Sequence, residues 1–186
     1  MIKNAFIAAV LLSALNTQAA DLSYTYLDVG LGVIEVEDEG ETYDGDGVAL
    51  GGSIAAGEVF YFTAELANAD IENVEQRTTS LGVGVHAPLS TNTDVYADVS
   101  YVRADIEEGD WSIDDNGVGY TLGIRSKLAE KFELGGGVSR LDVFDSAENS
   151  YFVNGFFYPT ETLGIGAEYS WADDTTAYSL GLRVNF

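Results

Sequence analysis

The sequence has no cysteine, two prolines and eight basic residues, which stand against 31 acidic residues in a chain of 186. A small fold that is held together by disulfides is therefore excluded. The formal net charge of −23 argues against a nucleic-acid partner, because the phosphate backbone would be repelled. Beyond the N-terminal segment, no apolar run approaches the roughly 20 residues that a membrane helix needs, which excludes a helical inner-membrane protein.

The composition nevertheless predicts a folded chain. Hydrophobic residues make up 46% of the sequence and aromatic residues 12%, which is more than a disordered acidic chain contains. Residues 1–20 have the layout of a cleaved signal peptide, with a basic residue at Lys3, an apolar run over 5–15, and small residues at Ala19 and Ala20. The remaining residues, 21–186, have the length of one domain.

Apolar residues recur with a period of two through most of this domain. In "LDVGLGV", large apolar side chains at Leu27, Val29, Leu31 and Val33 alternate with one acid and two glycines. The same alternation, which is typical of strands with one apolar face, recurs at 81–85, 118–124, 163–171 and 178–186. Ten such strands are separated by four short connections at 55–58, 88–94, 128–131 and 158–162, and by five acidic ones at 35–47, 70–77, 105–117, 142–149 and 172–176.

The even number of strands has a consequence for a membrane protein. Both ends of the chain then lie on one side of the membrane, as in bacterial single-chain outer-membrane barrels. Each strand offers roughly 9 to 11 residues, which is enough for a tilted crossing. We therefore predict an all-β fold, a transmembrane up-and-down antiparallel β-barrel, with ten strands preferred and eight as the alternative.

The last strand, "YSLGLRVNF", carries the most specific motif. Its predicted lipid-facing side holds Tyr178, Leu180, Leu182, Val184 and Phe186. With this strand and the signal peptide, the chain resembles the small outer-membrane β-barrel proteins, the group that includes OmpA-like transmembrane domains and the opacity-type porin superfamily. The resemblance implies export to the bacterial outer membrane and contact with its lipid and lipopolysaccharide. It also implies that the last strand is similar to the signal read by the β-barrel assembly machinery during biogenesis.

Charged residues on the opposite parity are predicted to face the barrel lumen. Two interpretations of them remain open. In the first, acids and bases pair and fill a narrow cylinder, where glycines leave room for long side chains. In the second, the excess of acids lines a small cation-selective channel. The residues concerned are Asp28, Glu65, His86, Asp98, Arg125, Glu133, Glu168 and Arg183.

The acidic ends of the strands are predicted to lie at the cell surface. Arg77, Arg103 and Arg140 have lipid-side parity there, where they either contact lipopolysaccharide phosphates or are simply solvated. The acidic loops should attract divalent cations, although a solvated charged surface is the simpler interpretation. The segment "EDEGETYDGDG" lacks the spacing of an EF-hand, so we predict no specific metal site.

Catalysis is not indicated by the sequence. The one histidine, His86, lies two residues before Pro88 at a short connection, away from the acidic loops, and the chain has no Cys nucleophile and no G-x-S-x-G elbow. We expect no enzyme activity and no cofactor. The predicted function is that of a non-enzymatic outer-membrane barrel that supports membrane integrity or surface interaction through acidic extracellular loops. The alternative is a small cation-selective porin.

Overall fold

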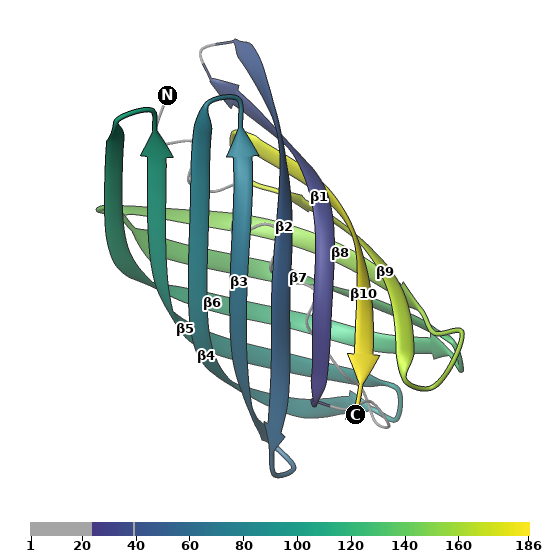
Figure 1. Cartoon of the computed structure of the whole chain (residues 1–186). Coiled ribbons are helices and arrows are strands. Elements are labelled where there is room, and N and C mark those ends of the chain that lie inside the picture. The colour runs from purple at the N-terminus through teal and green to yellow at the C-terminus, as the bar shows by residue number, and fades with distance from the viewer. Residues whose placement is uncertain (1–23, 39) are drawn as a thin grey trace.

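The computed structural model describes residues 24–38 and 40–186, so the predicted signal peptide lies outside the described residues. The described residues form ten antiparallel strands that close into a tilted barrel (Figure 1). Among them there is no helix long and apolar enough to cross a membrane. The strands are β1 (Tyr26–Asp38), β2 (Glu41–Ala56), β3 (Phe60–Ile71), β4 (Val74–Ser90), β5 (Thr93–Glu108), β6 (Trp111–Ala129), β7 (Phe132–Val143), β8 (Ser146–Phe157), β9 (Leu163–Trp171) and β10 (Thr175–Asn185).

The barrel is closed by pairing of its first and last strands. β1 runs antiparallel to β10, with Leu27 opposite Val184 and Val33 opposite Tyr178. The C-terminus therefore lies beside the start of β1 (Figure 1). Every other strand pairs with its neighbours in sequence order, which confirms the predicted up-and-down topology and the preference for ten strands over eight.

The alternation of side chains sorts them into an outer and an inner face. The lower barrel is the part nearer the short turns and the C-terminus. In this part of β1, Leu27, Val29 and Leu31 are exposed on the outside, while Tyr26 and Asp28 are buried on the inside. The outer face of the lower barrel is apolar on all sides, as a lipid-facing surface must be. Phe132 and Phe157 pack together near one end of this surface, and Tyr169 packs against Tyr178 near the other.

Four of the five acidic connections are mostly strand rather than loop, which corrects the expectation of acidic loops, and only the one at 172–176 is mostly turn. The strands continue to short turns at 72–73, 109–110, 144–145 and 172–174, and Gly40 lies in the turn that leads into β2. Two of these turns use glycine with positive φ, at Gly40 and Gly109, where a side chain would be strained. Most Glu and Asp side chains of the acidic connections therefore lie on the outer face of paired strands, whereas Asp115 and Glu148 lie opposite the inward residues Ala104 and Leu141. The predicted short connection at 88–94 likewise shrinks to 91–92.

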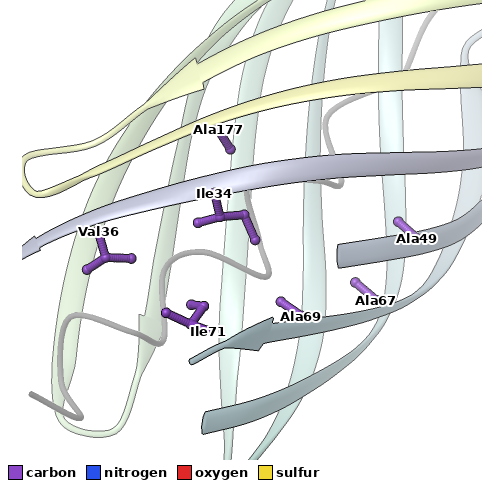
Figure 2. Packing of buried hydrophobic residues seen from close by; sticks show 7 residues of the cluster. All are labelled: Ile34, Val36, Ala49, Ala67, Ala69, Ile71 and Ala177. Carbon is purple, nitrogen blue, oxygen red and sulfur yellow. The ribbon is translucent and has the colours of Figure 1, made fainter. Parts of the chain in front are cut away.

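The apolar face changes sides near the end of the barrel that carries the acidic turns, here called the outer end. In β1, Ile34 and Val36 point inward and are buried, whereas Glu35 and Glu37 point outward. Figure 2 shows the resulting cluster, in which Ile34 and Val36 from β1 lie near Ile71 from β3. Four alanines complete it, namely Ala49, Ala67, Ala69 and Ala177. A second inner cluster comes from β5 and β7, formed by Val102, Ala104, Ile106, Leu141 and Val143.

Candidate functional site in the barrel lumen and at its outer end

The first lumen ion pair joins the two strands that close the barrel. Arg183 on β10 donates to both carboxylate oxygens of Asp28 on β1, at 2.8 Å from Nε and 2.7 Å from Nη2. The guanidinium lies between the rings of Tyr26 and Phe156, 4.1 and 4.3 Å from their centroids. Such a bidentate, stacked arrangement satisfies a buried Arg far better than Coulomb attraction does by itself.

A second pair lies lower in the lumen, on β6 and β7. Arg125 forms an ion pair with Glu133, and both side chains are fully buried. The hydroxyl of Tyr158 donates to the other oxygen of Glu133 at 3.3 Å. Two of the predicted lumen acids are thus neutralised by the two predicted lumen bases.

His86 lies in the lumen near the short turns. Its Nδ1 is 3.4 Å from a carboxylate oxygen of Asp94, and its ring packs at a tilt against Tyr24 with 3.7 Å between centroids. Its backbone N–H donates to the carbonyl of Val59 in the β2–β3 turn. The histidine is therefore held by an acid and an aromatic ring at the end opposite the acidic turns.

The remaining predicted lumen acids have no base within ion-pair distance among the described residues. Asp98 accepts a 3.3 Å hydrogen bond from the hydroxyl of Tyr61, and Glu168 accepts one from the amide of Asn154 at 3.2 Å. Together with Asp28, Glu65 and Asp98 line a cavity of about 80 Å³ in the middle of the barrel. That volume holds a few water molecules, which would hydrate carboxylates that lack a base.

Aromatic side chains fill much of the lumen, which the sequence analysis missed. Tyr61 lies against Gly84 so closely that a Cβ on this glycine would overlap its ring, and Tyr96 covers Gly123 in the same way. Both tyrosines are almost completely buried. The signal was present in the sequence as glycines and aromatics of the same parity on neighbouring strands. It could not be used there, because register decides which glycine faces which ring.

The three predicted surface arginines point outward near the acidic end, as their parity indicated. Arg103 contacts Asp105 at 3.1 Å and Asp114 at 3.3 Å. Arg77 contacts Glu75 and the amide oxygen of Asn68. In contrast, Arg140 donates to the neutral amide of Asn149 at 3.1 Å and has no carboxylate at ion-pair distance among the described residues.

The predicted assembly strand is β10 followed by Phe186. Tyr178, Leu180, Leu182 and Val184 are exposed on the outer face, and Phe186 is the most exposed of them at 77%. Tyr178 packs at a tilt against Tyr169, which stacks with Trp171, and Trp171 in turn stacks with Tyr151. Nothing in this geometry bears on the assembly machinery, and that role stays a prediction.

No cluster of three or more His, Asp or Glu side chains suited to a metal ion occurs within residues 24–38 and 40–186. Most of the acids at the outer end instead alternate along the strands with inward apolar residues. Spread out in this way, they form a charged surface rather than a coordination shell.

These features define the class of the protein, a membrane-spanning β-barrel with an apolar belt, a filled lumen and an acidic outer end. The chain belongs to the family of outer membrane protein beta-barrel domains, whose family model matches residues 5–186. Membership of this family implies location in the outer membrane. No curated protein matches the sequence significantly.

Solved structures of outer-membrane proteins are similar in fold. The β-domain of the Bordetella autotransporter BrkA is 9% identical with a TM-score of 0.54, over 89% of this chain and 100% of that chain. The KdgM porin in complex with disordered oligogalacturonate is 12% identical with a TM-score of 0.50, over 87% and 99%. A bacterial polysaccharide outer membrane secretin is 8% identical with a TM-score of 0.50, over 91% and 100%. At these identities the likeness shows the fold alone.

Proposed function

We propose that this protein is a non-conducting, non-enzymatic outer-membrane barrel that acts at the cell surface through its acidic outer end. The observation that carries the proposal is that buried side chains occupy the lumen at two levels. We therefore propose a function on the outside of the barrel rather than along its axis.

The lower closure is polar. Arg125 and Glu133 are fully buried, and Arg183 is held between an acid and two rings. An ion that passes here would have to separate these paired charges. Leaving one partner of a buried pair alone costs roughly 3–5 kcal/mol. Asp28, the partner of Arg183, lines the central cavity of about 80 Å³.

The upper closure is apolar. Ile34 is 1% exposed and packs with Val36 and Ile71, while Ile106 is buried in the second inner cluster. Hydrophobic constrictions stop ions because water withdraws from them. An ion would thus meet an apolar barrier before it reached the acids of the lumen.

The test is the conductance of refolded protein in a planar bilayer under a salt gradient. Folding is verified first by the gel shift that unboiled barrels show. We expect no stable conductance steps from folded wild-type protein. Stable steps with cation preference would instead establish the alternative, a small cation-selective channel with Glu65, Asp98 and Glu168 along its path.

The surface role is supported by the placing of Arg140. Its cross-strand neighbour is Tyr120, an outward aromatic, so the guanidinium lies at the level where lipid headgroups begin. Since Arg140 contacts a neutral amide whereas Arg103 is held by two acids, Arg140 is the better phosphate ligand. Lipopolysaccharide binding in micelles should fall in Arg140→Gln and change little in Arg103→Gln, and the reverse order would contradict this assignment.

The absence of catalysis is supported by where the histidine lies. His86 contacts Asp94 and Tyr24 next to the short turns, whereas the acids without base partners lie elsewhere in the lumen or at the outer end. A hydrolytic site built on His86 would therefore open away from the cell surface. Turnover of surface lipid or peptide by wild-type protein, lost in His86→Gln, would overturn this part of the proposal.

A further inference from the structure

A pocket of about 520 Å³ lies at the outer end, between the tip of the β5–β6 hairpin and the tip of the β7–β8 hairpin. It forms because the two hairpins differ in height. The last pair of β5 and β6 joins Glu108 to Trp111, whereas the outermost pair of β6 and β7 joins Val118 to Asp142. The β5–β6 hairpin therefore rises beyond its neighbour (Figure 1), and residues 111–117 of β6 have no pairing partner on β7.

The floor of this outer-end pocket is apolar. Leu141 and Val143 are buried beneath it, and Phe144 packs against the same cluster from the β7–β8 turn. Above the floor, Trp111 and Ile113 line the pocket and remain 43% and 39% exposed. An indole and a branched side chain left open to water offer a surface that an apolar group can cover.

The rim of the outer-end pocket is acidic, and no basic residue lines it. Asp115 accepts a 2.6 Å hydrogen bond from the backbone N–H of Phe144, which joins the two hairpins. Asp114 is partly neutralised by Arg103 at 3.3 Å. Asp145 and Glu148 have no such partner among the described residues, and the Oε1 atom of Glu148 is covered without any hydrogen bond.

The surroundings of Glu148 make an ionised carboxylate costly without a counter-ion. This residue lies beyond the outward ring of Tyr151 and so outside the membrane. Burial, and then the charges of Asp173 and Asp174 in the β9–β10 turn, raise the pKa of Glu148 to about 7. A cation placed beside it would relieve both effects.

We infer that the outer-end pocket binds a small organic cation that carries an aromatic or branched apolar group. The apolar group covers Trp111 and Ile113, and the cation lies beside Glu148 and Asp145. The volume falls in the range of small-molecule sites, roughly 300–1,000 Å³. An anion would be repelled by the four carboxylates, and a purely polar cation would leave the apolar floor exposed to water. This inference goes beyond the proposed function and does not depend on whether the lumen conducts.

Binding can be followed with 2-phenylethylammonium as the probe and Trp111 as the reporter. The chain has two tryptophans, so Trp171→Phe leaves Trp111 as the single indole and keeps an aromatic ring in the outward stack. The folded protein is titrated in non-ionic micelles at constant ionic strength. The neutral 2-phenylethanol and the anionic 3-phenylpropionate serve as controls of the same size.

We expect saturable quenching or a spectral shift with the cation, and at least about fivefold weaker binding of the alcohol, because a partly desolvated charge pair is lost. Asp145→Asn/Glu148→Gln should weaken binding of the cation by a similar factor, and Asn suits the positive φ of position 145. The matched control is Glu35→Gln/Asp44→Asn. It removes two outward acids that face each other across β1 and β2 and do not line the pocket. Equal binding of cation and alcohol, or an equal loss in both double variants, would overturn the inference.

Discussion

The lower barrel and its outer end are built on the same strands but have opposite polarity. Between the aromatic belts, β1 turns Leu31 outward and Asp28 inward, whereas beyond Val33 it turns Glu35 outward and Ile34 inward. β5 and β7 change in the same way, after Tyr101 and after Arg140 respectively. What surrounds the strand explains the change. Lipid requires an apolar outer face, but above the membrane water surrounds the strands, and the apolar residues move inside.

The difference teaches that one barrel can be held together in two ways. At membrane level, lipid covers the apolar outer face, and paired charges and aromatic rings fill the lumen. At the outer end, burial of isoleucine, valine and leucine stabilises the structure as in a water-soluble β-protein. The long acidic strands can thus stay ordered up to tight turns, where a chain without an apolar inner face would form loops.

The largest effect is expected from breaking the polar closure. Arg183→Met leaves Asp28 buried without its base and should lower the free energy of unfolding by about 3–5 kcal/mol. Asp28→Asn/Arg183→Met should recover most of this loss, because no lone charge remains. Urea unfolding in micelles measures both. If the single variant were as stable as the double variant, the ion pair would not be what holds the lumen.

A smaller effect is expected at the apolar closure. Ile34→Ala removes a side chain that is almost completely buried and should cost about 2–4 kcal/mol. Its sequence neighbour provides a matched control, since Glu35→Ala on the outward face should stay within about 0.5 kcal/mol. The comparison uses the same unfolding measurement. Equal effects at the two positions would mean that the polarity does not invert.

The smallest effect concerns the pH dependence of the outer end. Burial and the acids of the β9–β10 turn raise the pKa of Glu148 to about 7, above its ordinary value of 4.5. Protonated Glu148 is therefore favoured by folding, and its contribution to stability is full below pH 4.5 and is lost as the pH rises through 7. Unfolding of Glu148→Gln should show a shallower decline over this window than wild type. Parallel curves for the two proteins would contradict the assignment.

Much of the fold could be predicted from the sequence, because period-two alternation is strong in the lipid zone. Ten strands, their antiparallel order and the closing strand with Phe186 all follow from that pattern and from the spacing of turns. The inward placing of Arg125, Arg183 and the lumen acids follows from parity. Their pairing does not, because it depends on which residues lie opposite one another across the barrel.

The outer end could not be predicted in the same way. From the sequence, the acid-rich segments are interpreted as loops, since their Asp, Asn and Gly residues are typical of turns. The sequence does contain a sign that the strand continues. The apolar residues of β1 shift from odd positions, up to Val33, to even positions at Ile34 and Val36. A search for one uninterrupted apolar face stops at that change. The outer-end pocket was missed for the same reason, because it depends on the inner faces of strands taken for loops.

The inversion of polarity can be tested most directly by cysteine labelling, because the natural chain has no cysteine. Single variants Ile34→Cys, Glu35→Cys, Val36→Cys and Glu37→Cys are exposed, in intact outer membranes, to a maleimide that cannot cross them. We predict rapid labelling at 35 and 37 and labelling at least about tenfold slower at 34 and 36, because successive strand residues face opposite sides. Uniformly rapid labelling at all four positions would show a loop or an open mouth and would contradict the closed outer end.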